Sequence, residues 1–121
     1  NWCSAWTFWN FLLDENGGPR HAGGLHHSNI VTADTRTGEV SYNPPYYYLG
    51  HFSRWIKPGA KRVACTSNSD DFIATACANP DGSAAAVILN LSAADRIMQM
   101  WVNGQVIKYV APPHAIMTIA F

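Results

Sequence analysis

The chain has 121 residues, and its eight basic side chains balance eight acidic ones. This length suits one domain, or one small domain plus a piece of another. Because no basic stripe is present, the electrostatic pattern of a nucleic-acid-binding protein is absent. The longest apolar run, residues 84–89, is the size of a strand, whereas a membrane span needs about 18 residues or more. We therefore expect neither a nucleic-acid partner nor a membrane span.

Residues 3–13 are rich in tryptophan and phenylalanine and predict a strand that runs into a loop. Trp6 and Trp9 would point to opposite faces of such a strand, so one could be core and the other exposed. An exposed ring could cover the C–H face of a sugar while Asn10 holds its hydroxyl groups. For the two tryptophans, packing in a core and lining a sugar pocket both stay open as alternatives. The chain lacks an initiator methionine, and we expect it to begin within a longer protein.

Residues 14–28 predict a long loop, because they combine four glycines and a proline with three histidines. A loop of this length in a compact protein is more often functional than idle. Three imidazoles can in principle gather a metal ion. However, the adjacent His26 and His27 would point apart in an extended segment, and no carboxylate or cysteine lies at ligand spacing. We therefore expect solvated or hydrogen-bonded histidines, and neither a metal nor another cofactor.

Residues 30–33 and 40–42 flank a turn and predict a small hairpin. The Asn-Pro-Pro run that follows begins a helix, since proline is tolerated in a first helical turn. Over residues 46–56 apolar side chains recur at helical spacing, and Lys-Pro-Gly then ends the helix. The stripe consists of Tyr48, Leu49, Phe52, Trp55 and Ile56. We expect the three consecutive tyrosines to pack rather than to bind a ligand, and His51 to be a hydrogen-bonded structural histidine.

From residue 60 onward the apolar pattern changes to that of short strands. Asn103-Gly104 is the strongest hairpin signal, because a type I′ turn needs positive φ at both central residues. Short strands at this spacing indicate an antiparallel sandwich. The boundary between the two regions falls at residues 57–60, which divides the chain into 1–57 and 58–121. The six candidate strands are residues 61–66, 72–78, 84–91, 96–102, 105–110 and 115–121.

The three cysteines lack CxxC spacing and support neither a disulfide framework nor a zinc ribbon. A bridge between Cys65 and Cys77 and two buried free thiols remain as alternatives, and buried free cysteine is a common structural use. The glycosylation sequon that begins at Asn90 lies in a strong predicted strand, so we attribute it to chance.

The carboxylates bear on whether the chain is an enzyme. Glycoside hydrolysis needs two of them, about 5–10 Å apart, one kept protonated by an apolar setting. Six of the eight lie in turn signals, and the other two are adjacent in a loop. No Ser-His-Asp or Cys-His arrangement is legible, so we assign no catalytic residue to this chain. The carboxylates are Asp14, Glu15, Asp34, Glu39, Asp70, Asp71, Asp81 and Asp95.

Several ungapped motifs closely resemble, in the same order, the C-terminal part of glycoside hydrolase family 30, the glucosylceramidase-like family. They cover essentially the whole chain and end in the apolar strand of residues 84–90. The motifs are Trp6-Thr-Phe-Trp-Asn10, Gly17-Gly18-Pro19, Pro45-Tyr-Tyr-Tyr-Leu-Gly-His-Phe-Ser-Arg-Trp-Ile-Lys-Pro-Gly59, Arg62-Val63 and Pro80-Asp81-Gly82-Ser83.

The resemblance implies a mainly β chain: an immunoglobulin-like antiparallel β-sandwich preceded by the terminal βα unit of a (β/α)8 barrel. Residues 1–57 would be the last barrel strand, loop and helix. The parent would hydrolyse β-linked glucosides or glycolipids by a two-glutamate double displacement, with both glutamates on earlier strands. Its implied compartment is secreted or lysosome-like. Besides the substrate, the partner of this chain would be the rest of the parent enzyme or a second copy of the chain.

The resemblance also implies substrate-binding residues. Trp6 corresponds to the tryptophan that lines the family's glucose subsite, and Asn10, Arg20 and His21 would join it. Arg20 stands where the glucosylceramidases carry asparagine, which leaves the aglycone preference open. The alternatives to this interpretation are a stand-alone carbohydrate-binding or structural β-sandwich module and, from the loop histidines alone, a metal-binding loop protein.

Overall fold

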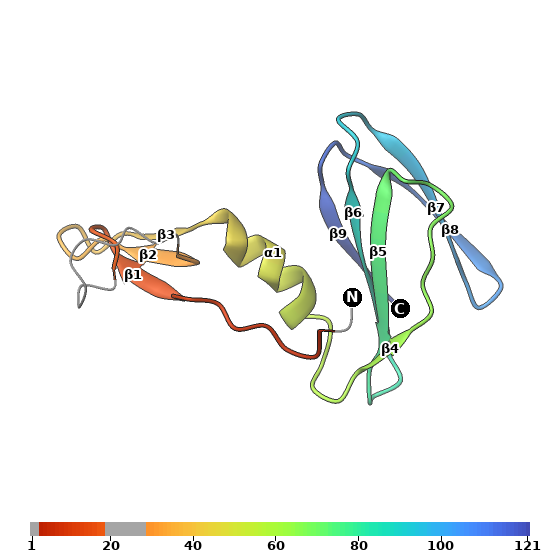
Figure 1. Cartoon of the computed structure of the whole chain (residues 1–121), viewed down its shortest axis with the longest axis horizontal. Helices are drawn as coiled ribbons and strands as arrows, with labels where there is room; N and C mark the ends of the chain where they lie inside the picture. Colours follow the sequence, from red (N-terminus) through yellow and green to blue (C-terminus); the bar gives the residue numbers. More distant parts are fainter. Residues whose placement is uncertain (1–2, 19–28) are drawn as a thin grey trace. The chain divides into compact units, whose positions relative to one another are not determined.

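The computed structural model describes residues 3–18 and 29–121 (Figure 1). By their internal contacts the residues form two compact units, Asn1–Leu49 and Gly50–Phe121. We describe each unit by itself. Among the described residues, no helix is both long enough and apolar enough to cross a membrane.

The first unit contains a three-stranded sheet of β1 (Leu12–Asp14), β2 (Val31–Ala33) and β3 (Val40–Tyr42). β1 pairs with β2 in parallel, and β2 pairs with β3 as an antiparallel hairpin. The hairpin predicted around residues 34–39 is confirmed. Its turn is closed by the Asp34 amide, which donates to the Glu39 carbonyl at 2.8 Å. Among the described residues of this unit, Ile30 and Val31 are the buried large apolar residues.

The strand predicted over residues 3–13 is wrong for most of its length, because only Leu12–Asp14 is a strand. Residues 3–10 have no pairing partner in the described part of the chain. A β-strand is defined by the hydrogen bonds that it forms with a neighbouring strand. Residues 3–10 have the composition of a strand but no such neighbour among the described residues, so they do not form one. The assumption that Trp6 and Trp9 alternate across a strand therefore does not apply.

α1 (Pro44–Ser53) begins at the predicted prolines but ends three residues earlier than predicted. The next residues continue as a turn, in which the Ile56 amide donates to the Phe52 carbonyl at 2.8 Å. Among the ten described residues of α1 none is buried. The expectation that its tyrosines pack in a core is not met within this chain, since Tyr46, Tyr47 and Tyr48 are all exposed.

The second unit holds two antiparallel sheets. The larger has the order β4-β5-β6-β9, and the smaller is the ribbon β7-β8 (Figure 1). All six predicted strands are confirmed, with shifts of one to three residues at some ends. Their bounds are β4 (Lys61–Val63), β5 (Phe72–Ala78), β6 (Ala84–Asn90), β7 (Arg96–Val102), β8 (Gln105–Ala111) and β9 (Ile116–Ala120).

The Asn103-Gly104 turn between β7 and β8 has the predicted backbone. Asn103 has φ 48° and Gly104 has φ 78°, as a type I′ turn requires. This turn matches the right-handed twist of the two strands that it joins. It also fixes their register, which pairs Val102 with Gln105 and Trp101 with Val106.

The core lies between the two sheets, as in a sandwich. Ala76, Ala86 and Ile88 from the larger sheet form one buried cluster with Met98 from the ribbon. β6 is one of the two inner strands of the larger sheet, and five of its seven residues are buried. Within the described ranges Cys3, Cys65 and Cys77 are free thiols, but none of them is buried: Cys3 is exposed, and Cys65 and Cys77 are half-buried.

Asn90 is fully buried at the end of β6. Its Nδ2 lies 2.8–3.1 Å from the carbonyl oxygens of Ala94, Ala111 and Pro112, and its Oδ1 accepts the Ser92 amide at 2.9 Å. The side chain therefore satisfies the backbone of two connections. Because a glycosylated asparagine must be accessible, the buried Asn90 agrees with the attribution of its sequon to chance, while its structural role was not predicted.

Candidate functional site

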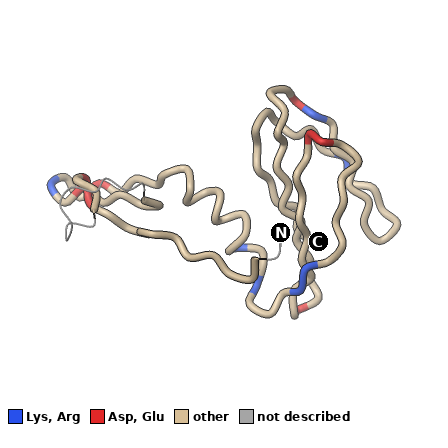
Figure 2. Tube along the Cα trace, in the orientation of Figure 1, with Lys and Arg blue, Asp and Glu red and all other residues tan. Residues whose placement is uncertain are grey.

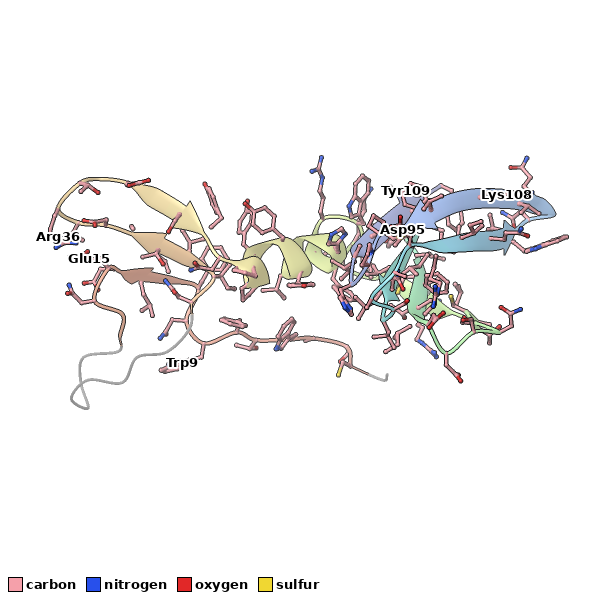
Figure 3. All side chains as sticks on the ribbon, turned by 90° about the horizontal axis from the view of Figure 1, so that it is seen from above. Trp9, Glu15, Arg36, Asp95, Lys108 and Tyr109 are labelled. Atoms are coloured by element: carbon pink, nitrogen blue, oxygen red, sulfur yellow. The ribbon has the colours of Figure 1, made fainter. Side chains whose placement is uncertain are left out.

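The aromatic segment before β1 is the first candidate for ligand binding. Trp6 is 66% exposed and Trp9 is 68% exposed. Trp6 contacts Phe8 edge-to-face, with ring centroids 5.9 Å apart. The peptide bond between Trp9 and Asn10 is cis. Figure 3 shows the Trp9 side chain extending from this segment. Both tryptophan rings are thus open for stacking in the described chain, and neither is part of a core.

Asn10 adds a polar group beside Trp9. Its Nδ2 is buried and has no hydrogen-bond partner in the described part of the chain. A buried amide without an acceptor costs about 1–3 kcal/mol, so such groups are normally paired in a complete site. Asn10 therefore has an amide donor available for an acceptor outside these residues.

The two remaining predicted site residues, Arg20 and His21, lie outside the described residues, as do His26 and His27. The metal-site alternative rests on these histidines, so it also lies outside the described residues. Among the described residues no group of three or more His, Cys, Asp or Glu side chains is placed to hold a metal ion.

A polar cluster lies where β1 and β2 end (Figure 2). The Thr35 amide donates to Glu15 Oε2 at 2.9 Å, and the Thr35 hydroxyl lies 3.1 Å from both carboxylate oxygens. Arg36 Nε lies 3.6 Å from Glu15 Oε1. Asp34 Oδ1 accepts the amides of Arg36 and Thr37 at 2.8 and 3.1 Å. These contacts join the residue after β1 to the turn after β2.

Hydrogen bonds favour the charged form of the two carboxyl groups in this cluster, Glu15 and Asp34. The Thr35 amide beside Glu15 lowers the pKa of that carboxyl. The pKa of Asp34 is lowered chiefly by its hydrogen bond from the Arg36 side chain. Both groups are therefore stabilised in the ionised form. A general acid of a glycosidase needs a raised pKa, so Glu15 and Asp34 do not suit this role.

A third carboxyl, Asp81, lies in the second unit and is also held ionised. The Lys57 ammonium group that hydrogen bonds to Asp81 holds the pKa of that carboxyl well below its usual range. Thus every described carboxyl with a shifted pKa is shifted downward. These three carboxylates therefore act as fixed negative charges that accept hydrogen bonds.

The segment after α1 is tied to the β5–β6 turn by Asn79, which is 8% exposed. Asn79 Nδ2 donates to the Trp55 carbonyl and lies 2.9 Å from Ser83 Oγ, while Oδ1 accepts the Lys57 amide at 2.9 Å. Lys57 also forms an ion pair with Asp81. The sequence analysis did not single out Asn79, because no local pattern indicates a contact with residues 22 and 24 positions away.

His51 is hydrogen bonded, as predicted. Its Nδ1 lies 2.9 Å from Thr118 Oγ1 of β9. The Thr118 hydroxyl lies 3.2 Å from the His51 carbonyl and donates to it. Nδ1 is therefore the donor to the threonine oxygen. The imidazole holds the end of α1 to the sandwich and has no described partner suited to catalysis.

Comparison with known proteins defines the class. The family model "Glycosyl hydrolase family 30 TIM-barrel domain" matches residues 1–56, and "Glycosyl hydrolase family 30 beta sandwich domain" matches residues 59–119. The lysosomal acid glucosylceramidase of Mus musculus is 40% identical over 93 residues, which are 76% of this chain and 18% of that protein. The putative glucosylceramidase 3 of Caenorhabditis elegans is 30% identical over 120 residues, 96% of this chain and 23% of that protein.

Solved structures agree with these relatives. The crystal structure of SrfJ from Salmonella typhimurium superposes with a TM-score of 0.87 at 28% identity, over 93% of this chain and 25% of that chain. An endo-β1,6-glucanase superposes with a TM-score of 0.82 at 25% identity, over 93% of this chain and 26% of that chain. The chain belongs to glycoside hydrolase family 30, with the end of its barrel and its β-sandwich. It spans about a fifth of the length of the curated relatives that it matches.

Proposed function

We propose that the chain is the C-terminal part of a retaining β-glycosidase that cleaves β-linked glucosides. Both catalytic glutamates would come from the part of the enzyme that precedes it. The observation that carries this proposal is the succession of two family 30 domain matches along the chain. The downward pKa shifts of Glu15, Asp34 and Asp81 support the view that the acid–base pair lies elsewhere.

The proposed contribution of this chain to the pocket is Trp6 with Asn10, Arg20 and His21. Support comes from the exposure of Trp6 and from the unpaired amide of Asn10. Trp9 is as exposed as Trp6 and precedes Asn10 directly, so it belongs in the same tests. The proposed domain boundary lies at residues 57–58, between the barrel end (1–57) and the sandwich (58–121).

The proposed substrate class is a β-glucoside or a glycolipid with a β-linked glucose. Relatives whose names include glucosylceramidase support the glycolipid. The proposed macromolecular partner is the rest of the parent enzyme or a second copy of the chain. The exposed apolar side chains of α1 support a partner of this kind.

The test compares two proteins on an aryl β-glucoside. The first is the 121-residue chain, for which we expect no hydrolysis above buffer. The second is a chimera in which this chain replaces the matching segment of the mouse glucosylceramidase. We expect the chimera to hydrolyse the substrate and to release glucose with retained β-configuration. Turnover by the repurified 121-residue chain, or a folded chimera without activity, would overturn the proposal.

The alternative of a stand-alone carbohydrate-binding module has one observation in its favour. The ribbon β7-β8 exposes Trp101 to 74%, with Gln99 two residues away on the same face. An exposed ring beside an amide suits a sugar surface. Glycan-array binding by the 121-residue chain that Trp101→Ala abolishes and Trp6→Ala does not would favour this alternative.

A further inference from the structure

The connection between β1 and α1 adds β2 and β3, which form one three-stranded sheet with β1. In barrel enzymes such connections from strand to helix build the face that carries the active site. β1 and β2 are parallel, so their carboxyl ends reach the same edge, where Asp14 pairs with Ala33. The next residue on one side is Glu15, and on the other side the hairpin turn begins.

Glu15 is the contact point between these two ends. Its carboxylate receives the Thr35 amide, the Thr35 hydroxyl and the Asn16 side-chain amide, the last at 3.1 Å. The Arg36 guanidinium adds an ion pair at 3.6 Å. Figure 3 shows Glu15 and Arg36 next to one another at this edge. Only 15% of the Glu15 side chain is exposed, whereas Arg36 is 74% exposed.

The contact with Thr35 spans 20 positions of sequence. It therefore extends the link between these segments by one side-chain tether beyond the β1–β2 ladder, which ends where Asp14 pairs with Ala33. The neighbouring Asp34 does not compete for Thr35, because its carboxylate is occupied by Arg36 and by the turn amides. Glu15 also precedes Asn16 and Gly17, whose amides bond to the side chain and the carbonyl of Asp14. The start of the loop and the turn are thus fixed to one another.

We propose that Glu15 is a positioning residue of the glycosidase, which holds the β2–β3 turn to the end of β1 and so sets the shape of the active-site face around the bound aglycone. This proposal rests on the proposed function. Glu15 does not touch the reacting atoms. Its removal therefore changes substrate binding more than the chemical step, and kcat and KM separate the two effects.

The experiment uses the chimera and its Glu15→Gln variant, which keeps the side-chain volume and loses the charge. The matched control is Glu39→Gln, because Glu39 is an exposed carboxylate of the same hairpin. We expect Glu15→Gln to raise KM for a glycolipid by about threefold to tenfold and to change kcat by less than about twofold. Glu39→Gln should leave both unchanged. An equal fall in kcat and kcat/KM, or no effect, would overturn the proposal.

A second measurement does not depend on turnover. Hydrogen exchange followed by mass spectrometry should show the Thr35 amide protected in the chimera and less protected in Glu15→Gln, whereas the Arg36 amide, which bonds to Asp34, keeps its protection. Thr35→Val retains the amide and removes the hydroxyl, and its effect on KM should be less than additive with Glu15→Gln. An inactive chimera in which Glu15 still protects Thr35 would refute the proposed function and support the tether. Unchanged protection in Glu15→Gln would refute the tether itself.

Discussion

Trp6 illustrates how a residue can be large, apolar and yet outside a core. Its ring is 66% exposed and touches Phe8 at its edge, so little burial is lost when it is removed. A side chain with this exposure contributes little to the stability of the chain through burial. The same holds for Trp9, whose exposure is 68%.

We predict that Trp6→Ala in the chimera lowers kcat/KM tenfold or more, which is about 1.4 kcal/mol of lost transition-state binding. The melting temperature should change little, because the ring is not buried. Trp9→Ala is the matched comparison and reports which of the two rings faces the sugar. A large loss of stability with unchanged kinetics would assign Trp6 to a core of the complete enzyme.

We expect the hydrogen bonds of the Asn79 side chain to stabilise the second unit. Asn79→Ala leaves the Lys57 amide and the Trp55 carbonyl without their partner. We predict a loss of about 1–3 kcal/mol in the free energy of unfolding of the second unit, since buried groups would become unsatisfied. Asn68→Ala, at an exposed position, should stay within about 0.5 kcal/mol. Urea unfolding of the 121-residue chain checks both variants, and equal effects would contradict this role.

At the scale of elements, β7 separates an inner from an outer face. Met98 is 7% exposed and packs in the core cluster, whereas Ile97 is 74% exposed. We predict that Met98→Ala costs about 2–5 kcal/mol in unfolding free energy. Ile97→Ala should cost less than about 0.5 kcal/mol. Denaturant unfolding measures both, and the reverse order would show that the ribbon pairs with its partner sheet through the other face.

The β2–β3 hairpin should depend on pH through Glu15 and Asp34. Both carboxyls have a pKa below the usual values of 4.5 and 3.8. A lowered pKa means that the stabilisation is present above the usual pKa and is lost as the pH falls through the lowered one. We predict how the protection of the turn amides from hydrogen exchange depends on pH in the chimera, after correction for the intrinsic exchange rate. The protection should be constant above about pH 5 and should fall in stronger acid. Glu15→Gln should flatten the pH dependence of the Thr35 amide and leave that of the Arg36 and Thr37 amides, which bond to Asp34. A loss of protection on raising the pH would contradict the prediction.

At the scale of the whole molecule, the sandwich and α1 differ in how completely their apolar residues are covered. The sandwich has a buried cluster between its sheets. In α1, by contrast, none of the ten described residues is buried, and Tyr48 and Phe52 are exposed. Exposed apolar surfaces of this kind commonly mark sites of association.

We predict that residues 1–57 are ordered only against another chain. If three large apolar side chains stay exposed, each loses roughly 1.5–3 kcal/mol of burial free energy, and the sum is comparable to the stability of a small domain. Amides of the sandwich strands in the 121-residue chain should be protected from exchange, while those of residues 1–57 gain protection in the chimera or in an oligomer. Light scattering reports the oligomer. A strict monomer with strong protection throughout residues 1–57 would contradict the prediction.

The elements that could be predicted from the sequence are those whose signals are local. Alternating apolar residues between turn residues located β5 and β7 at their observed bounds. Asn103-Gly104 specified a type I′ turn because few other residues accept positive φ at both positions. The start of α1 followed from its prolines. Each of these rules depends on the backbone of a few neighbouring residues and not on the rest of the molecule.

The tertiary structure alone decided which residues meet across the chain. Glu15 and Thr35 are 20 positions apart, and Asn79 and Lys57 are 22 apart. No periodicity connects such pairs, because their contact depends on parallel strand register in one case and on the path of the chain after α1 in the other. Pairing also decided that residues 3–10 are not a strand within this chain. Local preference shapes an element, but a strand, a tether or a core needs the partner that packing brings to it.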